Sequence, residues 1–323
     1  MIDQRNEILA LLNSGSSFLV VSHENPDGDC IGATLALTLA LQGMGKRAVA
    51  FNDDFVPHYL RWLAGADELV HTADPAAFDV VCVLDCGAPD RIGKLTERVL
   101  AHPRVIDIDH HGANEGFGLA NYVAPTASST SELLHGVLKF LGAELTPGIA
   151  TCLYLGIYTD TNMFKNANST PEAYQACGEL VAAGAESMTV AKRVYIETTA
   201  ERLQLMARVL STLQIDDDGR IAGMVCTQRD LHEFNAKPED LETFVEHPRA
   251  IIGVRAAYLL RELEDGVTVK GSLRSNDDID VAEVAATLGG GGHVRAAGFR
   301  AKGTIAEVRA LLVEKLRRAV ADQ

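Results

Sequence analysis

The first half of the chain alternates short apolar runs with segments of helical spacing, and this alternation limits the possible folds more than any other feature. The apolar runs cover residues 18–21, 48–51, 80–84 and 105–108, and the helical segments cover residues 32–41, 130–141, 148–158 and 171–184. Short apolar strands separated by helices predict an α/β fold with a parallel sheet that helices cover on both faces. In such sheets, ligands bind beyond the carboxyl ends of the strands.

The pattern changes after residue 185. Residues 186–212 have helical periodicity and lead to a turn signal, Asp-Asp-Asp-Gly, at 216–219. Longer strand-like runs follow at 221–226, 250–260 and 267–273, with helical segments at 281–288 and 305–320. We therefore predict an N-terminal parallel-sheet domain at 1–190, a helical linker at 191–215, and a smaller α+β domain with a mixed sheet at 216–323.

The charge balance bears on the class of ligand. The 323 residues include 44 acidic and 29 basic residues, which gives a net charge of −15. Such a surface repels long polyanions, because affinity for duplex nucleic acid comes from Lys and Arg that neutralise phosphates. Residues 1–212 hold 25 acidic against 14 basic residues, whereas residues 213–323 hold 19 against 15. The first part has carboxylates to spare for metal ions, and the second has more cations for an anionic ligand.

The sequence also indicates a compartment. No apolar run of about 18 residues or more predicts a membrane span, and the start MIDQRNEILA lacks the basic and apolar regions of a signal peptide. The six cysteines form neither a CxxC pair nor a disulfide framework. We expect a cytoplasmic protein with free thiols and no membrane partner.

Four polar clusters stand at or near the ends of the predicted elements, and they carry the chemistry. His23, Asp27 and Asp29 follow the first strand, and Asp85 follows the run at 80–84. The triplet Asp109-His110-His111 follows the run at 105–108, and Asp160 ends the helical segment at 148–158. Taken singly, each could be a turn, a cap or an incidental polar residue.

Taken together, these clusters predict a metal site. Several carboxylates and imidazoles at one edge of a sheet would repel one another unless cations lay between them. Oxygen and imidazole ligands without thiolates suit two divalent ions, with Mn²⁺ favoured and Mg²⁺ or Co²⁺ as alternatives. Paired divalent ions are characteristic of phosphoester hydrolysis, in which they acidify a water that attacks phosphorus.

A fifth cluster lies in the second domain. Arg274 and Ser275 end a predicted strand, and four consecutive glycines at 289–292 precede His293. Such glycines let backbone N–H groups approach a phosphate closely, and Arg274 offers a bidentate donor. The alternative is a flexible loop without a ligand. We favour anion recognition, with neither a Walker motif nor a dinucleotide fingerprint.

At this point the residues resemble a known family. The segment at 23–29, then Asp85, Asp109-His110-His111 and Asp160, is similar to the four motifs of the DHH phosphoesterase superfamily. The runs GSLRS at 271–275 and GGGGHVRAAG at 289–298 resemble its DHHA1 C-terminal domain. The resemblance covers nearly the whole chain. Length and layout are most similar to the nanoRNase type, described as oligoribonuclease and pAp phosphatase.

The resemblance implies roles for these residues. One metal would be held by His23, Asp27 and Asp85, and the other by Asp29, Asp85, His110 and Asp160, with Asp85 bridging. His111 would donate to the scissile phosphate, and Asp109 would orient the histidines. Substrate-binding residues would be Arg274, Ser275, Gly291, Gly292 and His293.

The implied activity is hydrolysis of short RNA or DNA oligonucleotides, pApA and pAp, which yields mononucleotides. The family suggests a homodimer. A cyclic or linear dinucleotide phosphodiesterase is the main alternative, and a RecJ-like single-strand exonuclease, a manganese pyrophosphatase and a non-hydrolytic nucleotide sensor are further ones. The sequence leaves open the polarity of cleavage, the choice between RNA and DNA, and the physiological substrate.

Overall fold

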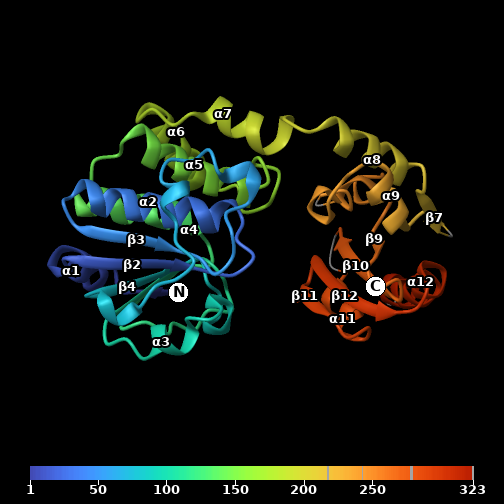
Figure 1. Cartoon of the computed structure of the whole chain (residues 1–323), viewed down its shortest axis with the longest axis horizontal. Helices are drawn as coiled ribbons and strands as arrows, with labels where there is room; N and C mark the ends of the chain where they lie inside the picture. The colour runs from blue at the N-terminus through green and yellow to red at the C-terminus, as the bar shows by residue number, and fades with distance from the viewer. Residues whose placement is uncertain (217, 242, 277–278, 322–323) are drawn as a thin grey trace. The chain divides into compact units, whose positions relative to one another are not determined.

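The computed structural model describes residues 1–216, 218–241, 243–276 and 279–321, apart from the side chain of His293. The chain divides into two compact units, Met1–Glu197 and Thr198–Gln323. Each unit is built on its own six-stranded sheet (Figure 1). Within the described residues, no helix combines the length and the apolar character that crossing a membrane requires.

The sheet of the first unit has the strand order β1-β6-β5-β4-β2-β3. Five strands are parallel and only β1 pairs antiparallel, with β6. The predicted parallel sheet is thus confirmed, with an added edge strand. The strands are β1 (Ile2–Asp3), β2 (Ser17–Ser22), β3 (Arg47–Phe51), β4 (Val80–Leu84), β5 (Val105–Asp109) and β6 (Ala120–Val123).

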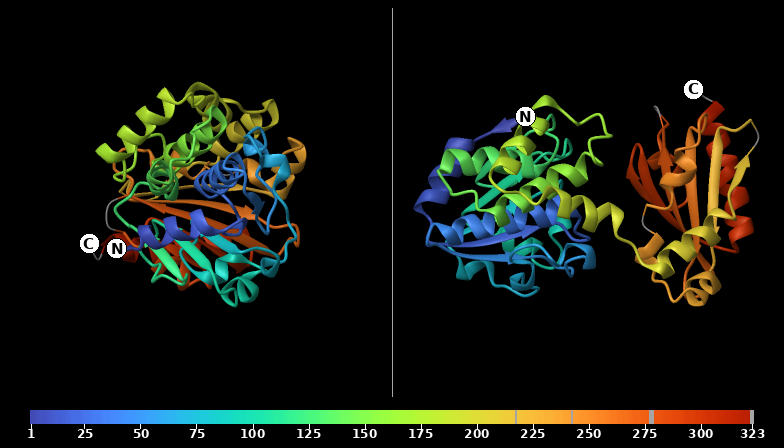
Figure 2. Two further views of the ribbon diagram at one scale, coloured as in Figure 1. Left: turned by 90° about the vertical axis from the view of Figure 1, so that its left-hand side faces the viewer. Right: turned by 90° about the horizontal axis from the view of Figure 1, so that it is seen from above.

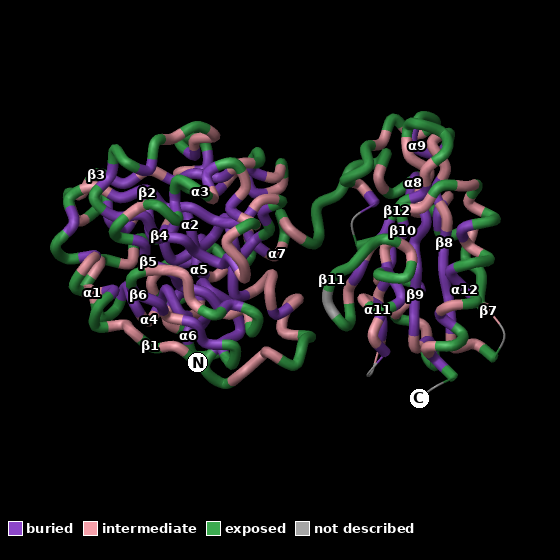
Figure 3. Tube along the Cα trace, turned by 90° about the horizontal axis from the view of Figure 1, so that it is seen from below, coloured by how far each residue is buried: buried purple, intermediate pink, exposed green. Residues whose placement is uncertain are grey.

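Helices cover both faces of this sheet, because its central strands are apolar on both sides (Figures 2 and 3). On one face, Val20, Leu84 and Ile108 join the main core with the longer helices; on the other, Val21 and Val83 pack with the short elements between β3 and β5. The helices are α1 (Arg5–Ser14), α2 (Gly28–Gly43), α3 (Thr96–Leu100), α4 (Thr130–Leu141), α5 (Pro147–Asp160), α6 (Pro171–Ala182) and α7 (Ser187–Ala191). Short 3₁₀ turns η1 to η4 cover His58–Leu60, Ala66–Glu68, Pro75–Ala77 and Pro89–Ile92, and a π-helical turn, η5, covers Lys192–Ile196.

Helices α2 and α5 cross at backbone contact. A Cβ atom on Gly32 would lie 2.4 Å from the carbonyl oxygen of Cys152, a distance that real Cβ atoms do not reach. Both helices are apolar on nearly all sides and buried over most of their length, which fits elements inside a core. Because α2 carries Asp29 in its first turn and α5 ends at Asp160, this crossing also positions two predicted metal ligands.

The sheet of the second unit has the order β11-β12-β10-β9-β8-β7 and is mixed, as predicted, because only β8 and β9 are parallel. Helices α11 and α12 pack on one face and α8 to α10 on the other. The strands are β7 (Gln214–Asp216), β8 (Ile221–Cys226), β9 (Ala256–Glu262), β10 (Thr268–Ser275), β11 (Gly291–His293) and β12 (Ala296–Lys302). The helices are α8 (Ala200–Leu210), α9 (Gln228–Glu233), the 3₁₀ turn η6 (Pro238–Leu241), α10 (Glu246–Arg249), α11 (Val281–Ala286) and α12 (Ile305–Ala321).

Two predicted segments differ in detail. The strand expected at 250–260 begins only at Ala256, because residues 246–249 form α10 and the chain turns before β9. In the stretch 191–215, expected as a linker, α8 buries Leu205 and Val209 in a core of the second unit. Strands β11 and β12 were not predicted, since the glycine run at 289–292 is typical of a loop. The compact units of the structure divide between Glu197 and Thr198. The domain boundaries predicted at 190 and 216 remain a proposal.

We predict that Gly32→Ala destabilises the first unit. The added methyl group meets the α5 backbone, which cannot move without opening the core, and overpacking of this kind costs about 1–3 kcal/mol. The midpoint of thermal unfolding should fall by several degrees, on the order expected from that cost. Gly43→Ala is the matched control, because it lies in the same helix and its Cβ would meet nothing within 4 Å. An unchanged midpoint for Gly32→Ala would contradict the close crossing.

Candidate active site

Three adjacent strands of the first sheet end beside one another, and each is followed by a predicted site residue. In the order β5-β4-β2, the chain continues into His110, Asp85 and His23. Asp85 adopts a left-handed backbone conformation with φ +57°, which is costly for a residue with a Cβ and is typical of functional sites. Its N–H group donates to Ile108 O at 3.0 Å, and this bond fixes the turn.

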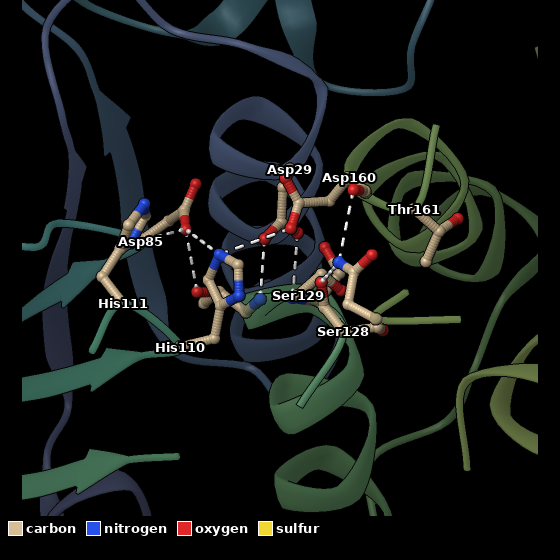
Figure 4. Close-up of polar contacts among 12 residues, drawn as sticks. Asp29, Asp85, His110, His111, Ser128, Ser129, Asp160 and Thr161 are labelled. Atoms are coloured by element: carbon tan, nitrogen blue, oxygen red, sulfur yellow. Dashed lines mark hydrogen bonds and ion pairs between the residues drawn. The ribbon is translucent and has the colours of Figure 1, made fainter. Parts of the chain in front are cut away.

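The six predicted metal ligands come together in overlapping groups. His23, Asp27 and Asp85 form one group, and Asp29, His110 and Asp160 form another; within each, the potential ligand atoms lie within 4.8 Å of one another. A third group joins Asp85 and His110 with His111. His110 Nε2 lies 3.6 Å from Asp85 Oδ1 and 3.4 Å from Asp160 Oδ2, so it stands between the two carboxylates (Figure 4).

Asp29 is anchored by the start of α4. Its two carboxylate oxygens accept hydrogen bonds from the backbone N–H groups of Thr130, at 2.6 Å, and Ser131, at 2.9 Å. The first N–H groups of a helix have no partner within the helix and carry its positive dipole end, so they stabilise a carboxylate. The Thr130 hydroxyl also donates to Asp85 Oδ1 at 3.0 Å. Helix α4 therefore holds two ligand carboxylates in place.

His23 is oriented for metal binding through Nε2. Its Nδ1 lies 2.7 Å from the carbonyl oxygen of Glu24, which can only accept a hydrogen bond. The guanidinium Nη2 of Arg91 lies 3.2 Å from the same nitrogen, and the opposite nitrogen, Nε2, faces Asp85 Oδ2 at 3.6 Å. Contacts to Nδ1 that leave Nε2 directed at the candidate ligands are typical of ligating histidines.

His111 is held by a chain of buried hydrogen bonds. Its Nδ1 donates to Asp109 Oδ1 at 2.7 Å, and its backbone N–H donates to the same oxygen at 3.1 Å. The other Asp109 oxygen accepts from the Asn114 amide at 2.9 Å. That amide also donates to both oxygens of Asp107, at 3.2 and 3.1 Å. Asn114 thus links two buried carboxylates and completes the support of His111.

The electrostatics reflect crowding of like charges. Burial and the nearby Asp85 raise the pKa of Asp29 well above its usual range, and burial and Asp29 do the same to the pKa of Asp160. Burial alone would also raise the pKa of Asp85, but hydrogen bonding to His23 and the charges of the neighbouring imidazoles bring it down to about 2. Behind the site, burial and Asp109 raise the pKa of Asp107 to about 7.

The donor set fits divalent cations. The three groups offer carboxylate oxygens and imidazole nitrogens, and none contains a cysteine. Four carboxylates that share one partly buried site repel one another, and cations between them remove that repulsion. Oxygen and imidazole ligands are those that Mn²⁺ and Mg²⁺ take in proteins. The residues present therefore fit a pair of such ions.

The predicted substrate-binding residues lie in the second unit. Arg274 Nε donates to Glu246 Oε1 at 2.9 Å, so its guanidinium is already held in one orientation. The Ser275 hydroxyl is buried and donates to Ile279 O at 2.7 Å. Gly291 and Gly292 belong to β11, and the side chain of His293 lies outside the described residues. Gly292 has φ +145°, and a Cβ there would lie 2.6 Å from Ala296 O, so strand pairing alone requires a glycine at this position.

Comparison with known proteins gives the family. The DHH family N-terminal domain matches residues 17–157, and the DHHA1 domain matches residues 218–322. The bifunctional oligoribonuclease and PAP phosphatase NrnA of Thermus thermophilus is 35% identical over 287 residues, which is 88% of this chain and 84% of that protein. The chain belongs to the DHH family of phosphoesterases, as its sequence motifs predicted.

Solved structures agree with this assignment. An exopolyphosphatase-related protein from Bacteroides fragilis is 30% identical, with a TM-score of 0.91 over 98% of this chain and 96% of that one. The exonuclease RecJ bound to manganese shares the fold, with a TM-score of 0.54 at 18% identity over 99% of this chain and 95% of that one.

Several site residues were not predicted from the sequence. Thr130 and Ser131 belong to a Ser-Thr-Ser-Glu run in which Ser129 and Glu132 have the spacing of a helix N-terminus. The sequence therefore indicates where the helix begins, but not that its first N–H groups bind Asp29. Asn114 gave no signal of its own. Its role depends on Asp107 and Asp109 facing the same side of β5, which follows from the two-residue period of a strand.

We predict that Mn²⁺ binds more tightly as pH rises. The raised pKa values of Asp29 and Asp160 keep part of these carboxyl groups protonated in mildly acidic solution, and a cation must displace those protons. Titration calorimetry at pH 6 and pH 8, in buffers of different ionisation enthalpy, should show weaker binding at pH 6 and proton release on binding. Asp160→Asn should reduce both effects, and Asp67→Asn, on an exposed 3₁₀ turn, should change neither. Affinity independent of pH would contradict this assignment.

Proposed function

We propose that the protein is a metal-dependent phosphoesterase that degrades short oligonucleotides to mononucleotides and removes the 3′-phosphate of pAp. The observation that carries the proposal is the convergence of six carboxylate and imidazole side chains at one edge of a sheet. The name of the Thermus thermophilus relative, an oligoribonuclease and PAP phosphatase, supports this class of substrate.

In this proposal two divalent cations, with Mn²⁺ preferred, occupy the site. His23, Asp27 and Asp85 hold one, while Asp29, Asp85, His110 and Asp160 hold the other. When bound, such ions supply positive charge to the phosphoryl oxygens and acidify the attacking water. No side chain of the protein then needs to act as the nucleophile.

His111, held by Asp109 and Asn114, has a separate role as a donor to the substrate. Because Nδ1 donates to Asp109, the opposite ring nitrogen, Nε2, is the one available to the substrate. Burial lowers the pKa of His111, but the hydrogen bond to Asp109 outweighs burial and raises it, which favours the protonated ring. A protonated His111 donates to a phosphoryl oxygen as negative charge develops there.

The second unit carries cations suited to the substrate's phosphates. Arg274 lies on β10, and on the same strand Lys270 is directly opposite Arg261 of β9 and Arg300 of β12. Basic side chains in register across a sheet present positive charge to an anion. A hollow beside Leu259 is lined by Arg261, Lys270 and Ser272. We assign this sheet face, which also carries Arg274, to binding of the nucleotide phosphates. Ser275 at the end of β10 and the glycines of β11 complete the proposed set.

The charge of the chain favours short substrates. A net charge of −15 opposes the long-range attraction on which binding of long duplexes depends. A dinucleotide has few phosphates, which the local cations and bound metal can neutralise. We include a homodimer and a reducing, cytoplasmic setting in the proposal, and the six unpaired, buried cysteines are consistent with the latter.

The experiment that tests this function compares initial rates on a panel of substrates. The Mn²⁺-loaded protein is given end-labelled RNA of increasing length, pAp, pApA, cyclic-di-AMP and pyrophosphate. We expect the highest rates on pApA and the shortest RNAs, with release of mononucleotides, and phosphate release from pAp. Asp85→Asn should abolish these activities, because two of the ligand groups lose a shared carboxylate.

The same panel identifies the competing functions. Preference for pyrophosphate, for cyclic-di-AMP or for the longest RNA would each overturn the proposed substrate class. Near-normal turnover by Asp85→Asn would contradict the metal mechanism. Tight nucleotide binding without any product would indicate a sensor.

We predict a specific defect for Asn114→Ala. Without the amide, the Asp109 carboxylate loses one of its donors and lies beside Asp107 with nothing between them, so His111 is less firmly oriented. Loss of such a supporting contact typically costs about 10- to 100-fold, here in kcat. Mn²⁺ stoichiometry by calorimetry should stay at the wild-type value, because Asn114 contacts none of the proposed ligands. Asn13→Ala, on the exposed part of α1, is the control and should leave kcat unchanged. Loss of Mn²⁺ binding together with kcat would refute a role through His111.

A further inference from the structure

A cluster of aromatic rings surrounds the last turns of α5, the helix that ends at the proposed metal ligand Asp160. Tyr158 stands two residues before Asp160, and the rings of Phe164 and Tyr195 pack edge-on against it with centroids 5.7 and 5.6 Å away. Tyr154 stacks on Tyr158 from the previous turn of α5, and Tyr174 stacks on Phe164. Five aromatic rings from four segments thus surround the carboxyl end of α5.

Two irregular backbone segments bring these rings together. After Asp160 the chain has three consecutive non-glycine residues with positive φ, Asn162, Met163 and Phe164, at 48°, 60° and 60°. Tyr195 lies in the π-helical turn η5. Both conformations are rare and unfavourable, and both are concentrated at functional sites.

Tyr195 combines exposure with closeness to the metal site. Its residue is 36% exposed, although its ring packs on Tyr158. Burial, Tyr158 and the Asp160 carboxylate raise the pKa of Tyr195 to about 12, so the phenol stays neutral and lies within the field of that carboxylate. A partly exposed aromatic ring therefore packs on the last turns of the helix that ends at Asp160, a proposed metal ligand.

The charges around this ring argue against a phosphate as its ligand. The nearest cations of the same turn, Lys192 and Arg193, both pair with Glu197, at 3.2 and 3.1 Å. The Asp160 carboxylate adds negative charge that raises the pKa of Tyr195. A neutral, flat group fits this surface, and in a nucleotide that group is the base.

We propose that the nucleobase next to the scissile phosphate stacks on the exposed ring of Tyr195. This inference rests on the proposed function and adds a base-binding subsite to it. Stacking tolerates every base, because all bases have a π face, so this subsite would bind without reading sequence. The contacts of Tyr195 with Tyr158, and of Tyr158 with Phe164, hold the platform rigid before substrate arrives, which reduces the entropy lost on binding.

The test measures binding of a dinucleotide with a non-hydrolysable linkage, together with two analogues in which one base or the other is replaced by an abasic sugar. Tyr195→Ala should weaken binding of the complete dinucleotide by about 5- to 150-fold, the range that stacking of one base represents. Tyr195→Phe keeps the ring and should bind within about 2-fold of wild type, on the same reasoning. Phe140→Ala removes an exposed aromatic ring elsewhere on the first unit and should have no effect.

The abasic analogues separate a base contact from a structural defect. For the analogue that lacks the stacked base, wild type and Tyr195→Ala should bind equally. Equal weakening of all three ligands, or no weakening of the complete dinucleotide, would overturn the inference. Because binding is measured without turnover, failure of the wild-type protein to hydrolyse pApA would refute the proposed function and leave this comparison intact.

Discussion

Repulsion among buried carboxylates is the interaction on which the rest of the first unit depends. Asp29, Asp85 and Asp160 lie close enough to alter one another's protonation, and burial denies them the screening of water. Several elements offset this cost: the N-terminus of α4 donates to Asp29, the imidazoles of His23 and His110 face Asp85, and the cations we propose would remove the remainder. The fold therefore keeps these carboxylates close together at a position where a bound divalent ion would offset their repulsion.

This arrangement is rigid for identifiable reasons. The strands β2, β4 and β5 are buried on both faces, so the loops that follow them start from fixed positions. Each loop is then tied by specific hydrogen bonds, such as those between the His23 ring and the accepting oxygen of Glu24, and from the Asn114 amide to Asp109. Supporting contacts of this kind decide whether a ligand reaches its metal in the correct orientation.

The sequence was informative wherever one periodicity or one cluster sufficed. The runs at 80–84 and 105–108 predicted β4 and the first four residues of β5, and the acidic and histidine clusters after them predicted the candidate ligands. The sequence was uninformative where contacts between distant residues determine the structure. Asn114 matters only because Asp107 and Asp109 share a face of β5. Strand β12 pairs with β10 at a position where Gly271 leaves room for Phe299.

The bare contact between α2 and α5 has a consequence for how such a site can change over time. At Gly32 one main chain lies directly on another, so no side chain is present whose size could be adjusted to shift the helices. The span between the start of α2 and the end of α5, and with it the spacing of two acidic ligands, is therefore set by polypeptide geometry. Surface loops can change in sequence and length while the distance between these two acidic residues stays the same.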